Sequence, residues 1–589
     1  MTKTPIDAIL GARGAQRPRL TSDGQTLFYC SDRDGRMQLW RTPAGGGPHT
    51  KLTDVDRVGR YVLSPDGSTI AFGVDHGGNE HWAVQVMPSA GGVARDLTAA
   101  PERIHHLLAW RPDGKAVFVA TNRRDARFFD VAEVTLDGTS RTVFQHDGTG
   151  AGAAVLGDGR LVVRTDRERS DRNHLTLVEP DGGTRRLTPD EPPSLHGVPR
   201  VFGGDLLVRS DRGRDFVGIA RISLDGAYEP LVEAGHDADE LDAAGERWAY
   251  DLNVDGRSEL HVVGERDGVV DGLPPGALAT DQFGESLAVA DDGTVAVARS
   301  AFDRPNTIWL VAPDGRPRLA VDASMDGIAA DDLPAAELVA WTSFDGRRIP
   351  GFLLRPKDAR GAMPTIVQVH GGPEGQARPL WNPLTIALVA AGFAVLQPNV
   401  RGSSGYGRAY MSLDDVRLRM DSVRDLDAAA AWLVERGLAP ADRIGLIGGS
   451  YGGFMTLAGV AFLPERWRAA VAIVAIGRWR TFLERTDAWR RPLREAEYGT
   501  IEHDGEFLES ISPFNHLDAI RAPLMVIHGA NDPRVPVQES EQMVAALRGR
   551  GHDVTYLRYE DEGHGLAKAK NRADAWPRVV DFFGAKLMA

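Results

Sequence analysis

The stretch RIGLIGGSYGGF, residues 443–454, decides how the second half of this chain folds. It contains an apolar run, the pattern Gly448-x-Ser450-x-Gly452 and the start of a helical pattern. Glycines on both sides of the serine permit a sharp turn from strand to helix, because they tolerate backbone angles that other residues avoid. Such a turn presents the serine hydroxyl at the edge of a sheet. We therefore predict a strand, a tight turn and a helix, with Ser450 as a candidate nucleophile.

The sequence around this stretch alternates short apolar runs with helical patterns. We expect strands at 365–369, 394–397, 444–447, 470–476, 524–528 and 555–559, and helices that include 423–436 and 537–548. Strands that alternate with helices indicate an α/β architecture with a mainly parallel sheet.

Two further polar side chains follow expected strands of this sheet. Asp532 comes shortly after the strand at 524–528, and His564 shortly after the strand at 555–559. The chain order Ser, Asp, His at strand ends is that of the α/β-hydrolases. In that arrangement His564 takes the proton of Ser450, while Asp532 orients the imidazole. We therefore predict residues 329–589 to be an α/β-hydrolase catalytic domain.

A tetrahedral intermediate at Ser450 would need hydrogen-bond donors for its negatively charged oxygen. We expect one donor to be the backbone N–H of Tyr451, directly after the nucleophile. We expect the other to be the N–H of Gly372, in the HGGP stretch at 370–373 that follows an expected strand. The alternative is that this Gly-Gly pair serves only the conformation of a turn.

The first half of the chain repeats one pattern, a turn followed by a short alternating run. Copies begin at residues 21, 64, 111, 156 and 290, with weaker ones at 202 and 243, a spacing of roughly 41–47 residues. A second strand-turn unit follows each copy, so every repeat supplies two hairpins and four strands. Four strands per repeat is the construction of a propeller blade. We predict a seven-bladed β-propeller over residues 11–328, after an N-terminal segment at 1–10.

Composition excludes several other classes of protein. The 589 residues include 68 Lys and Arg against 82 Asp and Glu, a formal charge of −14, so the basic surface of a nucleic-acid-binding protein is not expected. No secretory signal pattern and no apolar run of roughly 18 residues occurs, which predicts a cytoplasmic protein without a membrane span.

Cysteine and metal chemistry are also not expected. The single cysteine, Cys30, lies in an apolar run and is expected in the core, where it forms no disulfide. The Asp-Gly pairs of the repeats are usual hairpin turns rather than calcium ligands. We therefore predict neither a metal site nor a cofactor.

Taken together, these motifs resemble the prolyl oligopeptidase family of serine peptidases, in particular its acylaminoacyl-peptidase-like branch. The matching segments are HGGP at 370–373, NVRGSSGYG at 399–407, GGSYGG at 448–453, NDPRVP at 531–536 and EGHG at 562–565. The resemblance covers essentially the whole chain, since a propeller followed by a hydrolase domain is the family's architecture. It assigns the triad roles to Ser450, Asp532 and His564.

The resemblance also implies substrate-binding residues. Arg534 matches the arginine that holds a carbonyl of the substrate's P2 residue, with a surface salt bridge as the alternative. The loop at 477–498 matches the region that lines the S1 pocket, and its aromatic residues are Trp479, Phe482 and Trp489. These aromatics suit the core of the domain equally well. Glu374 follows HGGP directly, so it either favours a basic P1 side chain or is a solvated loop residue.

The resemblance implies a serine peptidase that hydrolyses short or acylated peptides through an acyl-enzyme intermediate, under a propeller that limits access. One alternative is an esterase or amidase for a small molecule. Another is a dipeptidyl aminopeptidase, which needs a carboxylate pair in the cavity; acidic candidates are Asp237, Asp239 and Glu240. A third is a propeller that serves as a docking surface for a partner. Exposed blade edges also allow a homo-oligomer, as among relatives.

Overall fold

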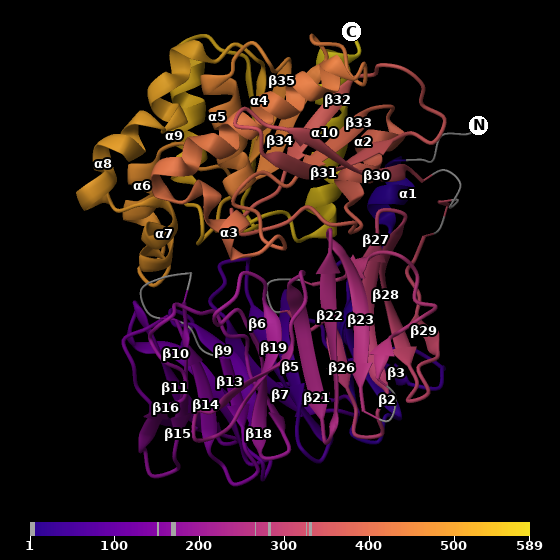
Figure 1. Cartoon of the computed structure of the whole chain (residues 1–589), viewed down its shortest axis with the longest axis vertical. Coiled ribbons are helices and arrows are strands. Elements are labelled where there is room, and N and C mark those ends of the chain that lie inside the picture. Colours follow the sequence, from indigo (N-terminus) through magenta and orange to yellow (C-terminus); the bar gives the residue numbers. More distant parts are fainter. Residues whose placement is uncertain are drawn as a thin grey trace.

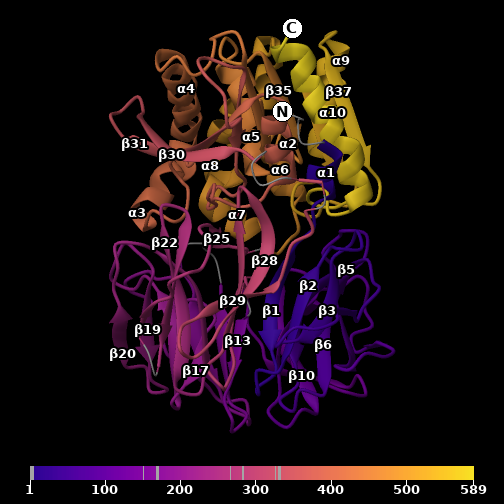
Figure 2. The same ribbon diagram turned by 90° about the vertical axis from the view of Figure 1, so that its right-hand side faces the viewer.

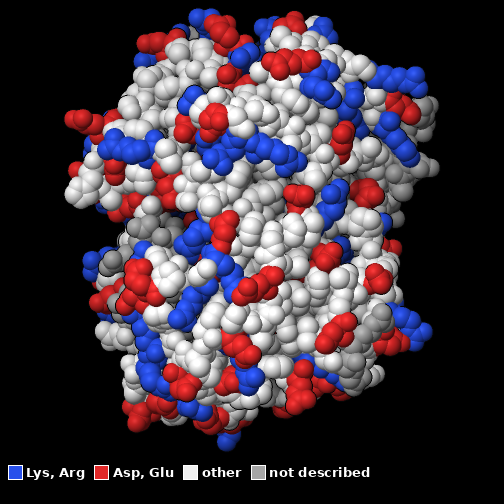
Figure 3. All heavy atoms as spheres, viewed as in Figure 1, with Lys and Arg blue, Asp and Glu red and all other residues white. Residues whose placement is uncertain are grey.

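The computed structural model describes residues 6–149, 152–166, 172–264, 267–280, 284–325, 327–328 and 333–589. The chain forms two stacked parts, with an all-β part below and an α/β part above (Figures 1 and 2). Basic and acidic side chains are interspersed over the visible face of both parts (Figure 3). No helix among the described residues combines the length and the apolar character that a membrane span needs.

The lower part consists, over the described residues, of seven antiparallel sheets that follow one another in the chain. The first three are β1 (Ala15–Leu20), β2 (Thr26–Ser31), β3 (Gln38–Pro43) and β4 (Thr50–Lys51); β5 (Arg57–Leu63), β6 (Thr69–Asp75), β7 (Ala83–Pro88) and β8 (Arg95–Asp96); and β9 (His105–Trp110), β10 (Ala116–Asp125), β11 (Phe128–Thr135) and β12 (Ser140–Phe144).

The next three sheets are β13 (Gly152–Val155), β14 (Leu161–Thr165), β15 (His174–Val178) and β16 (Thr184–Arg186); β17 (Arg200–Phe202), β18 (Asp205–Ser210), β19 (Gly218–Ile222) and β20 (Tyr228–Val232); and β21 (Ala238–Ala244), β22 (Arg247–Val254), β23 (Arg257–Val263) and β24 (Gly268–Val269). The seventh contains β25 (Ala277–Leu278), β26 (Leu287–Val289), β27 (Val295–Ala301), β28 (Arg304–Val311) and β29 (Pro317–Val321). Backbone hydrogen bonds between Arg13 and Ser324, of 3.0 and 3.1 Å, join the two ends of this ring.

The Asp-Gly turns have the chemistry that the repeats predict. In the second blade, Gly67 has a φ of 70°, which glycine adopts without strain. The Asp66 carboxylate accepts hydrogen bonds from the Ser64 hydroxyl at 2.6 Å and the Ser68 N–H at 3.0 Å. These bonds lower the pKa of Asp66 to about 2. The aspartate therefore stabilises the hairpin turn.

The upper part is built on one sheet, whose described strands are ordered β30-β31-β33-β32-β34-β35-β36-β37. These strands are β30 (Ala335–Thr342), β31 (Arg348–Arg355), β32 (Thr365–Val369), β33 (Ala394–Pro398), β34 (Ile444–Gly449), β35 (Ala469–Ile473), β36 (Leu524–Gly529) and β37 (Val554–Tyr559). The pairing is antiparallel up to β33 and parallel from there on. All six predicted strands are present, with ends that differ by at most a few residues.

Helices cover both faces of this sheet. They are α2 (Pro383–Ala390), α3 (Arg408–Met411), α4 (Arg419–Glu435), α5 (Tyr451–Phe462), α6 (Trp479–Arg485), α7 (Arg491–Tyr498), α8 (Ile501–Ser510), α9 (Gln538–Gly549) and α10 (Ala569–Leu587). Side chains alternate across the pleat, so Leu446 packs in the core with α4 and α5, whereas Ile447 packs in the core with α2 and α10. The predicted fold class, a seven-bladed β-propeller plus an α/β-hydrolase domain, is confirmed.

The first helix of the chain, α1 (Ile6–Gly11), lies against the upper domain rather than the propeller (Figure 1). Ile9 and Leu10 are buried in the core that α2 and α10 form. The domain limits 1–10, 11–328 and 329–589 stay predictions, and residues 1–5, 326 and 329–332 lie outside the described residues. Cys30 is buried in the propeller.

We predict that Ile9→Ala destabilises the hydrolase domain. Ile9 is fully buried, so truncation leaves a cavity that costs about 2–5 kcal/mol of unfolding free energy. Calorimetry or urea unfolding measures the loss. The control is Val93→Ala, because Val93 is 91% exposed and its truncation changes stability by less than about 0.5 kcal/mol. Equal effects of the two substitutions would contradict a structural role for α1.

Candidate active site

Ser450 lies at the turn between β34 and α5, in a strained backbone conformation. Its φ is 59° and its ψ is −120°, a region that costs a non-glycine residue of order 1–3 kcal/mol. A Cβ on Gly448 would lie 2.3 Å from the Gly452 carbonyl oxygen, and one on Gly452 would lie 2.3 Å from that of Val369. The turn therefore requires glycine at both positions. The Ser450 N–H donates to the Ile473 carbonyl at 2.9 Å, which ties the turn to the neighbouring strand.

Asp532 and His564 are in contact at the same edge of the sheet. The Nδ1 atom of His564 lies 2.7 Å from an Asp532 carboxylate oxygen. The other carboxylate oxygen accepts the backbone N–H groups of Arg534 at 2.8 Å and Val535 at 3.0 Å. Burial on its own would raise the pKa of Asp532, but His564 and His528 outweigh it and hold the pKa well below its usual range. Asp532 is therefore a carboxylate that can fix and charge-balance an imidazole.

A second buried carboxylate shapes the loop that carries His564. Glu562 accepts the backbone N–H groups of Ala567 at 3.0 Å and Lys568 at 2.9 Å. It also accepts the Asn571 side-chain amide at 2.8 Å, from the first turn of α10. Charge-assisted hydrogen bonds of this kind are stronger than neutral ones. Glu562 thus holds the loop in a fixed shape against α10.

The HGGP loop lies against Ser450. A Cβ on Gly371 would come within 3.4 Å of the Ser450 Cβ and within 3.2 Å of the Gly449 carbonyl oxygen. Gly372, with a φ of 141°, follows in the same loop. Its carbonyl accepts a hydrogen bond from the Tyr498 hydroxyl at 3.1 Å. Burial raises the pKa of Tyr498 well above its usual value, so this hydroxyl keeps its proton and donates.

The side chain of Tyr451 is anchored beneath the turn. Its hydroxyl donates to the Asp414 carboxylate at 2.9 Å and lies 2.9 Å from the Ser422 hydroxyl. Arg419 donates to the same hydroxyl at 3.1 Å, and its guanidinium lies 4.9 Å from the ring centre of Tyr498. The residues that carry both candidate oxyanion donors are therefore connected through one buried network.

The centre of this network is an arginine. Arg419 is 1% exposed and forms ion pairs with Asp414 and Glu497. Carboxylate oxygens of Asp414, Asp415 and Glu497 lie within 4.8 Å of one another, close enough to suggest a cation site. Because the guanidinium already bridges Asp414 and Glu497, we interpret the cluster as an ion-pair network.

Arg534 pairs with a residue of the propeller. Its Nε and Nη2 atoms lie 2.9 and 2.6 Å from one carboxylate oxygen of Glu80, on the loop between β6 and β7. The other oxygen of Glu80 accepts from Arg490 at 2.5 Å. Burial would raise the pKa of Glu80, but the two arginines lower it overall. The sequence analysis did not identify Glu80, because its partners lie more than 400 residues away in the chain.

The predicted S1 aromatics are divided between two places. Trp479 and Phe482 are fully buried and pack with Tyr498, at ring-centre distances of 4.4 and 6.2 Å. Trp489 packs instead on Phe129 of the propeller, with ring centres 5.3 Å apart. The first two can back a pocket without forming its open surface, whereas Trp489 joins the two domains. Glu374 is exposed on the HGGP loop.

The acidic residues considered for amine capture have partners in the protein. Asp237 accepts the backbone N–H groups of Val217 and Gly407, Asp239 pairs with Arg378 at 2.5 Å, and Glu240 accepts the N–H of Glu285 at 3.3 Å. Burial raises the pKa of Glu240 to about 7. Some of these contacts stabilise the propeller, and the others join the propeller to the hydrolase domain.

Comparison with known proteins agrees with this fold. Residues 381–589 match the sequence model of the prolyl oligopeptidase family. Dipeptidyl aminopeptidase BIII of Pseudoxanthomonas mexicana is 25% identical over 613 residues, covering 99% of this chain and 88% of that one. The acylamino-acid-releasing enzyme of Homo sapiens is 26% identical over 362 residues, covering 57% and 48%. A Mycobacterium tuberculosis puromycin-hydrolyzing peptidase structure has a TM-score of 0.86 at 22% identity, covering 99% and 96%.

The fold is that of solved prolyl endopeptidases, one of which matches all of this chain with a TM-score of 0.86 at 19% identity. The protein is a serine-type peptidase, an enzyme that hydrolyses peptide bonds. Its C-terminal part, residues 381–589, is a domain of the prolyl oligopeptidase family.

We predict that Tyr498→Phe slows turnover, because the Gly372 carbonyl loses its hydrogen bond while ring packing is kept. A hydrogen bond of about 1 kcal/mol corresponds to a roughly fivefold lower kcat, with a smaller change in KM. The matched control is Tyr410→Phe, whose hydroxyl donates to the Asn399 carbonyl instead. A change in KM alone, or equal losses in both variants, would show that Tyr498 does not position the loop.

Proposed function

We propose that Ser450, His564 and Asp532 are the catalytic triad of this peptidase. The observation that carries the proposal is that the strained turn at Ser450 and the Asp532–His564 pair all follow strands at the carboxyl edge of one parallel sheet. Strain of this kind persists where the surrounding structure enforces it, and nucleophile turns are such places.

In the proposed reaction the Ser450 Oγ attacks the carbonyl carbon of the scissile bond and His564 takes its proton. The carbonyl oxygen becomes an oxyanion, which the N–H groups of Tyr451 and Gly372 stabilise. Collapse breaks the C–N bond, and His564 returns the proton to the leaving amine. Water then hydrolyses the ester at Ser450, with His564 again as the base.

We further propose N-acylated or internal peptide segments as substrates, with Arg534 on the P2 carbonyl. Support comes from Glu80, whose two carboxylate oxygens are both bound by arginines. A free substrate amine would have to displace Arg490 or Arg534 to reach this carboxylate. The similarity to acylamino-acid-releasing enzymes agrees with this choice.

Dipeptidyl aminopeptidase action is the second candidate. It is favoured by the similarity to dipeptidyl aminopeptidase BIII, which extends over almost the whole chain. Esterase or amidase action on a small molecule is a further outcome that the same triad permits. A cytoplasmic location and homo-oligomer formation also stay predictions.

The test compares kcat/KM for matched anilides, one set N-acetylated and one with a free amine, across apolar and basic P1 residues. We expect faster turnover of the acetylated set, and a basic P1 preference would implicate Glu374. Faster turnover of the free-amine set would establish the aminopeptidase instead. Ser450→Ala is the blank, and stoichiometric fluorophosphonate labelling of that variant would rule out Ser450 as nucleophile.

We predict that Asp532→Asn lowers kcat by roughly 10³–10⁴-fold. The low pKa of Asp532 keeps its carboxylate ionised in the folded protein. Its contribution to folding stability is complete above the unfolded-state pKa of about 4 and is lost as the pH falls below that value. The variant should therefore be impaired throughout pH 5–9, measured with an acetylated anilide. Recovery of activity anywhere in that range would contradict the role of the carboxylate.

A further inference from the structure

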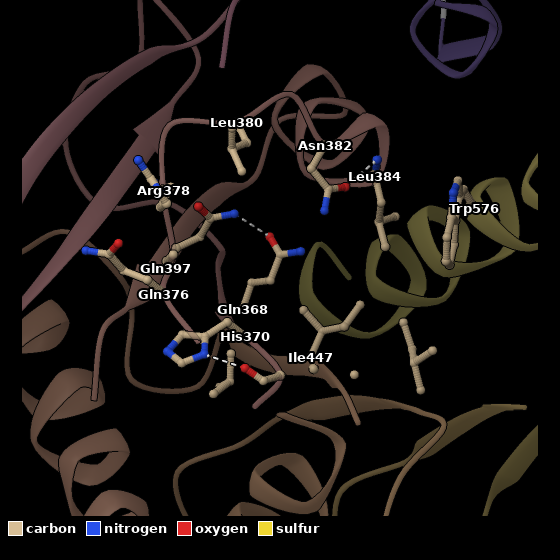
Figure 4. Close-up of a pocket in the computed structure, with 16 residues that line it drawn as sticks. Gln368, His370, Gln376, Arg378, Leu380, Asn382, Leu384, Gln397, Ile447 and Trp576 are labelled. Carbon is tan, nitrogen blue, oxygen red and sulfur yellow. Dashed lines mark hydrogen bonds between the residues drawn. The ribbon is translucent and has the colours of Figure 1, made fainter. Parts of the chain in front are cut away.

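A cavity of about 340 Å³ lies beside the nucleophile turn, at the carboxyl ends of β32 and β34 (Figure 4). Its walls include Gly449, which precedes Ser450, and Gly371, which lies against Ser450 in space. The start of α2 and Trp576 of α10 form its far side. The volume is at the lower end of the range of about 300–1,000 Å³ that is typical of small-molecule sites.

Four carboxamide side chains line the cavity. Gln376 accepts a hydrogen bond from Asn253 of the propeller at 2.7 Å, and hydrogen bonds to nearby groups fix the orientation of the other three. The Gln368 Oε1 accepts from Gln397 at 2.9 Å and from the Thr385 hydroxyl at 2.7 Å. The Asn382 Oδ1 accepts the N–H groups of Leu384 and Thr385 at the start of α2. The opposite ends, Gln368 Nε2, Asn382 Nδ2 and Gln397 Oε1, have no hydrogen-bond partner in the described part of the chain. They offer two donors and one acceptor to the cavity.

The cavity combines these amide groups with apolar walls and carries no unpaired charge among its described lining residues. Arg378 donates to the Asp239 carboxylate at 2.5 Å, and to Gly256 and Ser258 at 3.0 and 2.8 Å. Burial lowers the pKa of His370, which keeps its imidazole neutral. A surface of amide donors and acceptors without charge matches a neutral amide ligand, such as a peptide backbone.

The cavity lies on the side of the sheet that α2 and α10 cover. Trp479 and Phe482 pack on the opposite face of the sheet, in the core with α5. The His564 loop runs directly into α10, the helix that supplies Trp576. The leaving amine accepts its proton from His564, so it departs toward that loop and away from the aromatic side.

We propose that this carboxamide-lined cavity binds the leaving-group segment of the substrate, the first residues after the scissile bond. The proposal rests on the proposed function, since it needs an acyl-enzyme at Ser450. Gln368, Gln397 and Asn382 form hydrogen bonds with the backbone amides of the departing peptide, and Trp576 provides an apolar wall. The same cavity also binds an acceptor amine, which attacks the acyl-enzyme in the reverse of the acylation step and forms a new peptide bond.

The test uses that reverse step with a defined acceptor, alanyl-glycinamide. The acceptor's amine attacks the ester carbonyl at Ser450, a C–N bond forms, the C–Oγ bond breaks, and the amine's proton returns to the Ser450 oxygen through His564. An N-acetyl amino-acid p-nitrophenyl ester forms the acyl-enzyme, and chromatography measures the ratio of peptide product to hydrolysed acid.

We expect Gln397→Leu and Trp576→Ala each to lower this ratio at least fivefold at a fixed acceptor concentration. The matched control is Gln542→Leu, a glutamine of α9 that bonds Thr481 and Glu539 and does not line the cavity. Its ratio should stay within twofold of the wild type. Thermal unfolding verifies that each variant is folded, and Trp576→Ala still decides the question if Gln397→Leu does not fold.

An unchanged ratio in a folded Trp576→Ala or Gln397→Leu variant would overturn the leaving-group site. An equal fall in the Gln542→Leu control would overturn it as well. If the wild type releases p-nitrophenol without labelling of Ser450 by a fluorophosphonate, the triad assignment fails and the site fails with it. The two failures are therefore distinguishable.

Discussion

The structure of the active site depends on one backbone constraint, the positive φ of Ser450. A residue in this conformation persists only where its neighbours enforce it. Here the enforcement comes from Gly448 and Gly452, which let β34, α5 and the end of β32 approach within distances that any side chain would prevent. The same close approach brings the HGGP loop against the serine. The conformation of Ser450 and the position of the HGGP loop therefore both depend on the close packing at Gly448 and Gly452.

The propeller takes part in the site as well as covering it. Glu80 binds Arg534 and Arg490, and a Cβ on Gly563, next to His564, would lie 1.8 Å from the Gly78 carbonyl oxygen. The 76–81 loop therefore buttresses both loops that carry the Asp and the His. Buried charge pairs of this kind tolerate little displacement, because separating them leaves desolvated ions. The relative position of the two domains and the geometry of the catalytic face are thus linked.

The sequence alone predicts those structural features that depend on residues close together in the chain. Asp-Gly turns identify blades, and the flanks of Ser450 identify a strand and a helix, because those features depend on neighbours in the chain. The pairing of Glu80 with Arg534 and the bond from Tyr498 to Gly372 join distant segments, so no spacing reveals them. Trp489 illustrates the same limit: one aromatic residue in the loop packs on the propeller while its neighbours pack in the core. The carboxamide cavity likewise combines several separate segments.

The position of α1 has a consequence for synthesis. The ends of the propeller ring meet at Arg13 and Ser324, so its blades can close before the hydrolase domain is made. Helix α1 precedes the ring, yet its apolar face packs on α2 and α10, the latter near the end of the chain. Because chains fold progressively during synthesis, Ile9 and Leu10 remain without their final partners until α10 has been made. Helix α1 is therefore made long before it reaches its place.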